Sequence, residues 1–176
     1  DQNRFGADGG GSVSTGYALE LAGGVSEGDP VVMSGGAATS GGVALVWAAV
    51  TDGFAAVTDD AADTEIFRLT ANTATGVVTF AHSGVLDHSD PDSAADYTTD
   101  IETLADGQIL MRRTDTVTDS EGDSDSDSET VDLGGNAGIG DDAPVADVTV
   151  DGTFVEPVKY LYDGNTSASG NSENLV

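Results

Sequence analysis

The hydrophobic residues of this chain fall into short runs separated by glycines and acidic residues. In residues 17–22 (YALELA) every second position carries a larger apolar side chain, the period-two pattern of a half-buried strand. Residues 43–50 (VALVWAAV) are almost entirely apolar and predict a central buried strand that anchors the core through Trp47. Asp52-Gly53 is a strong hairpin signal. Further strands are predicted at 31–33, 54–57, 65–70, 77–82, 101–104 and 109–111.

The spacing of these runs indicates an all-β protein. The chain has 24 glycines in 176 residues, and aromatic residues make up 6%. Small β-forming residues interrupted by many glycines favour short strands and tight turns over helices. We therefore predict a compact β-barrel or β-sandwich of short antiparallel strands, with flexible acidic loops and arms.

The composition also changes along the chain, which predicts its organisation. Residues 1–16 are polar and glycine-rich and predict a flexible N-terminal arm, or a frayed terminus. Residues 17–113 form the β-rich core. Residues 114–143 are an acidic low-complexity insert, expected to be a solvated or disordered loop. Residues 144–176 are predicted to add strands within 145–162 and a polar tail to the same domain.

Charge narrows the classes of partner. The chain has 32 Asp and Glu against 5 Lys and Arg, and a formal net charge of −27. Such a surface repels itself in dilute buffer, but at molar salt the Debye length falls to about 3 Å and screens the repulsion. The composition therefore indicates a protein adapted to very high salt. Nucleic acid and anionic membranes are not expected as partners, because there is no basic patch to neutralise phosphates.

One acidic segment has the spacing of a calcium loop. Asp123, Asp125 and Asp127 occupy positions 1, 3 and 5, but Ser128 replaces the glycine at position 6 and Gly134 the glutamate at position 12. An EF-hand is therefore not expected. These carboxylates are the candidate metal residues, for loose binding of Ca²⁺, Mg²⁺ or Na⁺, and a solvated anionic loop is the alternative. No other cofactor is predicted.

No motif in the chain points to catalysis, and we expect a protein that is not an enzyme. There are no cysteines, and His82 and His88 are the two histidines. H-E-x-x-H is absent, and the G-x-S-x-G match at 24–28 (GVSEG) precedes a turn and a predicted strand rather than the helix of a nucleophile elbow, so no catalytic residue is assigned. Arg112 and Arg113 form an intersubunit anchor or, as the simpler interpretation, a local salt bridge to Asp115 or Asp119.

A family resemblance lies in residues 21–86. The segments LAGGVSEGDPVVMSG, GGVALVWAAVTDG and VVTFAHSGVL resemble small capsid-associated proteins of tailed viruses. Gly28–Val31, Gly42–Ala44 and Gly84-Val85 carry the match. The resemblance implies a β-barrel decoration protein that sits on a capsid shell, often as a trimer. With the charge, it implies a virus of a halophilic archaeon.

The leading hypothesis is therefore a structural virion protein that decorates or cements the capsid shell. Its partners would be the major capsid protein and copies of itself, and its location the capsid surface of the virion. Phe5 and Leu175 in the two tails are candidates for docking on neighbours. The alternative is a secreted or cell-surface β-domain of a halophilic archaeon, such as an S-layer-associated or adhesion module. A glycan-acting enzyme with two carboxylates is a third possibility.

Overall fold

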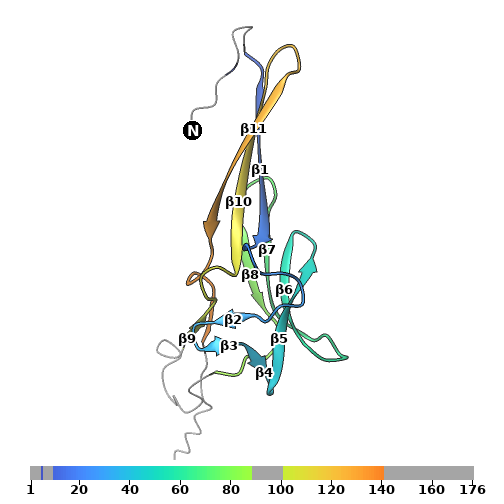
Figure 1. The fold of residues 1–176 in the computed structure, drawn as a ribbon, viewed down its shortest axis with the longest axis vertical. Helices are drawn as coiled ribbons and strands as arrows, with labels where there is room; N and C mark the ends of the chain where they lie inside the picture. The colour runs from blue at the N-terminus through green and yellow to red at the C-terminus, as the bar shows by residue number, and fades with distance from the viewer. Residues whose placement is uncertain (1–4, 6–9, 89–100, 141–176) are drawn as a thin grey trace, which may run out of the picture. The chain divides into compact units, whose positions relative to one another are not determined.

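A computed structural model describes residue 5 and residues 10–88 and 101–140, and all of these belong to the unit Asp1–Ala143. The described residues form strands, turns and loops and contain no helix, which confirms the all-β prediction (Figure 1). In chain order the strands are β1 (Ser12–Leu21), β2 (Val32–Met33), β3 (Gly36–Ala37), β4 (Thr39–Ser40), β5 (Val43–Val50), β6 (Gly53–Thr58), β7 (Glu65–Ala71), β8 (Val78–His82), β9 (Ile101–Thr103), β10 (Ile109–Thr118), β11 (Ser124–Asp132) and β12 (Gly138–Gly140).

The largest sheet is an antiparallel meander in the order β4-β5-β6-β7-β8. Strands β5 to β8 match the predicted apolar runs closely. The prediction for β5 needs correction: β6, not β5, is the middle strand, and β5 is buried on one face only, through Leu45 and Trp47. The β5–β6 turn consists of Thr51 and Asp52, and Asp52 has a φ of 59°.

The core lies on one face of this sheet. Trp47 is 1% exposed and meets Phe67 edge-on, with ring centroids 6.0 Å apart. Phe67 contacts Phe80 on β8 at a centroid distance of 5.4 Å. Leu19 and Leu21 of β1 and Ile109 of β10 pack against the same cluster. Two antiparallel sheets therefore share one apolar core, as in a β-sandwich.

The second sheet has the order β1-β10-β11 and overturns two expectations from the sequence. Residues 114–130, predicted to be a loop or disordered insert, instead form the second half of β10 and most of β11, joined by a turn at Asp119–Asp123. Residues 12–16, assigned to a flexible arm, are the first half of β1. The register runs from Ser12 opposite Thr118 to Leu21 opposite Ile109 without interruption.

Two small sheets complete the described part. The β2-β3 hairpin and the β9-β12 pair bring Val31, Met33, Leu104 and Ile139 into the core cluster. The strands predicted within 145–162 lie outside the described residues. The chain divides into the units Asp1–Ala143 and Pro144–Val176. Within the described ranges no helix has the length and apolar character needed to cross a membrane.

Candidate functional site

The β1-β10-β11 sheet shows two chemically different faces. Side chains alternate between the faces of a strand, and directly paired residues share a face. Even-numbered residues therefore fall on one side, where Ser and Thr dominate, and none of them is buried. We call this side the hydroxyl face; its hydroxyl residues are Ser12, Ser14, Thr114, Thr116, Thr118, Ser124, Ser126, Ser128 and Thr130.

Hydrogen bonds between strands order part of the hydroxyl face. The hydroxyls of Thr116 and Ser126 lie 2.7 Å apart across the β10–β11 pair. The Arg112 guanidinium donates to the Ser128 hydroxyl at 3.0 Å. Cross-strand hydroxyl pairs of this kind are each worth about 0.2–1 kcal/mol. From Thr114 outward, the face is thus a surface of polar, uncharged side chains carried by regular backbone.

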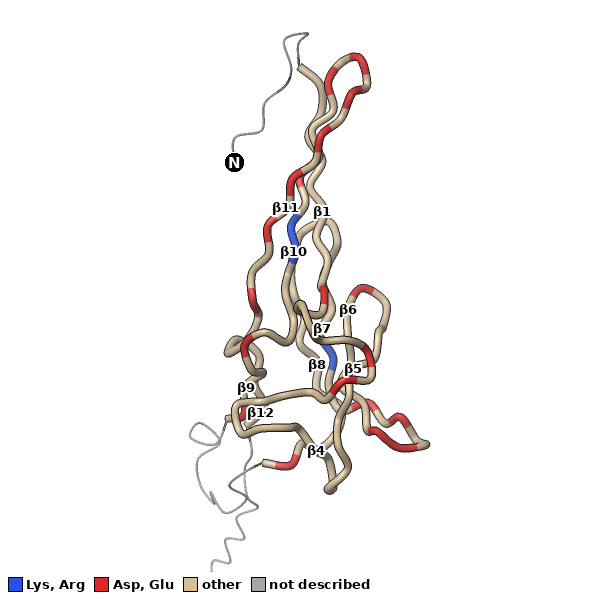
Figure 2. Tube along the Cα trace, in the orientation of Figure 1, with Lys and Arg blue, Asp and Glu red and all other residues tan. Residues whose placement is uncertain are grey.

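The opposite side, which we call the acidic face, carries Asp115, Asp125, Asp127 and Glu129 around Arg113. Asp115 and Asp127 are directly opposed across the strand pair. Asp115 accepts a hydrogen bond from the Thr15 hydroxyl at 2.7 Å and pairs with Arg113 at 2.8 Å, while Asp127 is exposed. Acidic residues follow β11 and its turn in Figure 2. Repulsion among the exposed carboxylates of the acidic face is therefore expected to weaken as salt screens them.

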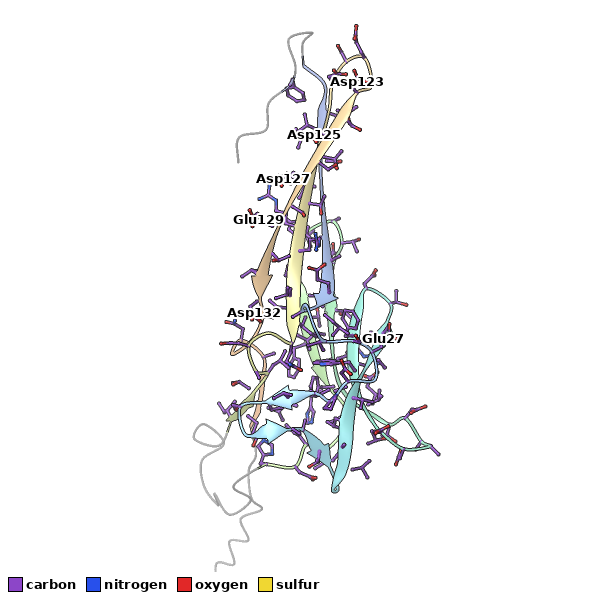
Figure 3. All side chains as sticks on the ribbon, in the orientation of Figure 1. Glu27, Asp123, Asp125, Asp127, Glu129 and Asp132 are labelled. Atoms are coloured by element: carbon purple, nitrogen blue, oxygen red, sulfur yellow. The ribbon has the colours of Figure 1, made fainter. Side chains whose placement is uncertain are left out.

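The structure spreads the candidate metal residues along the chain instead of gathering them. Asp123 lies in the β10–β11 turn, and Asp125 and Asp127 follow along β11, as Figure 3 shows. Two residues of a strand that share a face are about 7 Å apart along it. In the described part of the chain, no three acidic or histidine side chains are grouped so that they hold a metal ion. The calcium-like spacing does not make a carboxylate cage here.

Asp125 and Asp127 have a different role, at the edge of the sheet. The Leu133 amide donates to the carbonyl oxygen of Ile109. The backbone N–H and C=O groups of odd-numbered β11 residues therefore point towards β10, and those of even-numbered residues point outward. Asp125 accepts the outward amide hydrogen of Ser126 at 3.0 Å, and Asp127 accepts that of Ser128 at 2.9 Å. These carboxylates therefore block donors that an added strand would need, and they place negative charge there.

The two adjacent arginines are engaged within the sheet. Arg112 forms a bidentate pair with Glu20 of β1, at 2.7 and 2.9 Å, and this hydrogen bonding together with the charge of Glu20 raises the pKa of Arg112. Arg113 pairs with Asp115, as the simpler interpretation of the sequence predicted. The bridge to Glu20 was not predicted, because β1 and β10 are far apart in sequence.

The histidines lie near loops. His82 ends β8 and is exposed. Both ring nitrogens of His88 face backbone carbonyl oxygens, that of Leu86 at 3.1 Å and that of Ile139 at 2.9 Å, so His88 ties this loop to β12. The neighbouring Asp87 accepts hydrogen bonds from the amides of Gly41 and Gly42 and from the Thr39 hydroxyl. These bonds, led by that from Gly42, lower the pKa of Asp87.

A shallow open groove of about 500 Å³ lies beside the β5–β6 and β7–β8 turns. Threonines 51, 70, 75 and 79 line it, together with Asp52 and Asn72. The Asn72 side chain accepts the amide hydrogens of Ala74 and Thr75, so it shapes its own turn. Asp52 is the one carboxylate that lines the groove, whereas glycoside hydrolysis ordinarily uses a pair.

The hydroxyl face is the main surface that reasoning from the sequence missed. Its signal is a period-two pattern of hydroxyl residues, Thr114, Thr116 and Thr118 in one run and Ser124, Ser126 and Ser128 in the next. The low-complexity interpretation covers both runs, because their intervening residues are largely acidic. Two runs with this period, separated by a Gly-containing turn, are typical of a hairpin.

Comparison with known protein families yields a match over most of the chain. Residues 2–134 match the family described as Domain of unknown function (DUF5801). No curated protein matches the chain, and no solved structure does. The matched range contains strands β1 to β11 and ends just after β11, so β12 lies beyond it.

Proposed function

Because the chain belongs to the DUF5801 family, whose description assigns no function, we propose from its surfaces that it is a non-catalytic adhesion or surface-layer module of a high-salt cell envelope. The hydroxyl face is the observation that carries this proposal. It brings the Ser- and Thr-rich segments of two distant parts of the chain to one side of the sheet, where the side chains from Thr114 outward are uncharged. A flat array of donors and acceptors suits extended polar surfaces, such as polysaccharide or a protein layer.

The charge distribution supports an envelope in brine. Asp125, Asp127 and Glu129 of β11 lie on the acidic face. The hydroxyl face carries charge only towards the core, at Asp132 and at the Glu20–Arg112 pair. At molar salt the acidic face is screened and the hydroxyl face remains available for hydrogen bonding. The acids of this sheet thus maintain solubility while the uncharged side makes contact.

A second candidate is the capsid decoration protein of a haloarchaeal tailed virus. It is favoured by the segment that carries the resemblance, residues 21–86, which contains the whole five-stranded meander. However, the matching residues have structural positions: Gly28 has a φ of 84°, and Val31 is fully buried. They support a shared β-architecture more than a shared partner, so we rank this candidate second.

Fractionation of the source material separates the two candidates. Lysate is spread on a high-salt density gradient, and each fraction is analysed by peptide mass spectrometry. The envelope proposal expects the chain with membranes and surface-layer protein. Co-sedimentation with DNA-containing particles, in near-stoichiometric ratio to a shell protein, would replace it with the capsid candidate. Recovery only in the soluble fraction would remove both.

A binding experiment tests the hydroxyl face itself. The double variant Thr116→Glu/Ser126→Glu places charge at a hydrogen-bonded pair near the middle of this face. We expect its affinity for purified envelopes at molar salt to fall at least about tenfold, equivalent to about 1.4 kcal/mol. Val117→Glu, which lies on the acidic face of the same strand, is the matched control and should bind like the wild type. Equal binding by all three proteins would contradict the proposal.

A further inference from the structure

The two outer edges of the β1-β10-β11 sheet differ in whether side chains cap their outward backbone amides. On β11, carboxylates cover the outward amides of Ser126 and Ser128. On β1, the register makes the odd-numbered residues point outward, since Tyr17 donates away from β10 to the carbonyl oxygen of Thr73 at 2.9 Å. Edge strands left without such blocking are sites of strand addition.

Among the described residues, the β7–β8 turn covers only the core-proximal part of the β1 edge. The β7–β8 turn closes it at Tyr17, where Gly76 lies so close to the Tyr17 ring that a side chain on Gly76 would collide with it. Beyond that point, the outward N–H and C=O groups of Val13 and Thr15 have no hydrogen-bond partner among the described residues. An open edge of about 17 Å, five residues long, results.

This open edge is also uncharged. Residues 12–16 of β1 read SVSTG, whereas residues 124–129 of β11, on the opposite edge of the sheet, read SDSDSE. Val13 remains 45% exposed beside the open backbone. Asp115 of β10, which lies opposite Thr15 in the register, is already bonded to Thr15 and Arg113. Val13 and its neighbours therefore form a neutral, partly apolar edge on a strongly acidic protein.

We propose that the open edge of β1 pairs antiparallel with β1 of a second copy of this chain. A second copy fits because pairing with β11 would bring the edge against the capping carboxylates, whereas two β1 edges meet without charge. Val13 of one copy would oppose Thr15 of the other, in both directions, with Ser14 opposite Ser14 at the two-fold axis. Such a contact uses the same surface twice and closes as a dimer.

The pairing would join two three-stranded sheets into one sheet of six strands. Because directly opposed residues share a face, the hydroxyl faces of the two copies would become continuous. The inference goes beyond the proposed function and does not depend on it. The edge is short and each protomer is highly acidic, so the dimer should need molar salt to screen the repulsion.

The mass of the full chain in solution tests the proposal. Sedimentation equilibrium in about 3 M NaCl should give about twice the monomer mass of 17.6 kDa, falling to the monomer in dilute buffer. Val13→Asp should abolish the dimer at molar salt, with an unchanged circular dichroism spectrum. Val131→Asp is the matched control, since Val131 is an exposed valine on β11, and it should remain dimeric. A monomer at every salt concentration, or a trimer, would overturn the proposal.

A disulfide experiment keeps the test independent of the folding of Val13→Asp. The wild-type chain has no cysteine, so Ser14→Cys carries a single thiol. Two such residues facing each other in a non-hydrogen-bonded pair have Cα atoms about 4.5 Å apart, within disulfide range. Oxidation at molar salt should link most of this variant as a dimer, at least about tenfold faster than Ser126→Cys on the other edge. Equal rates would contradict pairing through β1.

Discussion

The core-proximal and distal halves of the β1-β10-β11 sheet share the same strands but differ in what stabilises them. Near the core, Leu19, Leu21 and Ile109 pack against the cluster around Trp47. From Thr114 outward, no residue of β10 or β11 is buried, and the sheet consists of backbone ladder, hydroxyl pairs and salt bridges. The first half gains stability from hydrophobic burial, and the second from hydrogen bonding under screening.

This comparison shows why burial alone is a poor guide to where regular structure ends. A strand pair with little apolar contact persists where an existing sheet templates it, since each added pair extends a ladder already in register. Arg112 contributes by joining Glu20 on β1 to Ser128 on β11 across the middle strand. We expect the two halves to respond to different perturbations.

Removing core volume should have the largest effect. Trp47→Ala deletes a side chain that is 1% exposed and contacts Phe67, so we expect a loss of about 3–5 kcal/mol in unfolding free energy. Urea unfolding at molar salt measures it, with Val131→Ala, at 59% exposure, as a control that changes stability by less than about 0.5 kcal/mol. A similar change for both variants would contradict a core centred on Trp47.

Lowering salt should affect the distal half first. Asp125 and Asp127 are about 7 Å apart along β11, a spacing beyond the Debye length of about 3 Å at 1 M salt but within about 10 Å at 0.1 M. Amide hydrogen exchange read by mass spectrometry should show β11 and distal β10 losing protection at 0.1 M, while β5 to β7 keep theirs. Uniform loss across both sheets would argue against two modes of stabilisation.

Removing the edge caps should produce a moderate change in association. Asp125→Ala/Asp127→Ala frees the outward amides of Ser126 and Ser128, and we expect assemblies larger than a dimer at molar salt, seen by light scattering. Asp125→Asn/Asp127→Asn removes the same charge but keeps an acceptor oxygen beside each amide. If both double variants associate equally, charge rather than capping protects this edge.

Lowering the pH through the pKa of Asp87 should have the smallest and most local effect on the unfolding free energy. Hydrogen bonds from Gly42, Thr39 and Gly41 lower the pKa of Asp87 below its usual value of 3.8, so its ionised form stabilises the folded state. This contribution is complete above about pH 4 and disappears as the pH falls through the lowered pKa. Asp87→Asn should cost about 1–2 kcal/mol at pH 7 and less at pH 2–3, measured by urea unfolding at both pH values. A pH-independent difference would contradict this origin.

The five-stranded sheet could be predicted because its apolar residues report directly on burial. In β5 and β7, Leu45, Trp47, Phe67 and Leu69 recur at every second position, and each is almost fully buried. The hairpin β10–β11 could not be recognised in the same way. Asp is depleted in strands and enriched in loops, and both faces of its distal half are polar.

What fixes the distal hairpin is pairing with β1, which no local pattern reveals. The candidate site shared this limit: the acidic run in residues 123–127 suggested a loop that binds cations, while the structure uses Asp125 and Asp127 along a strand. The local bridge from Arg113 to Asp115 was predictable because its partners are neighbours in sequence. The bridge from Arg112 to Glu20 required the fold.

The long sequence separation within the second sheet has a consequence for synthesis. Thr15 and Asp115 lie 100 positions apart. At about 5–20 residues per second, β1 leaves the ribosome roughly 5–20 s before the strand that pairs with it. The meander β4 to β8 is complete earlier, because its strands are neighbours in sequence. Nascent chains therefore pass through an interval in which the meander has all its strands and β1 has no β10 to pair with. Limited proteolysis of stalled nascent chains should show protection of β1 only in chains extended beyond residue 118.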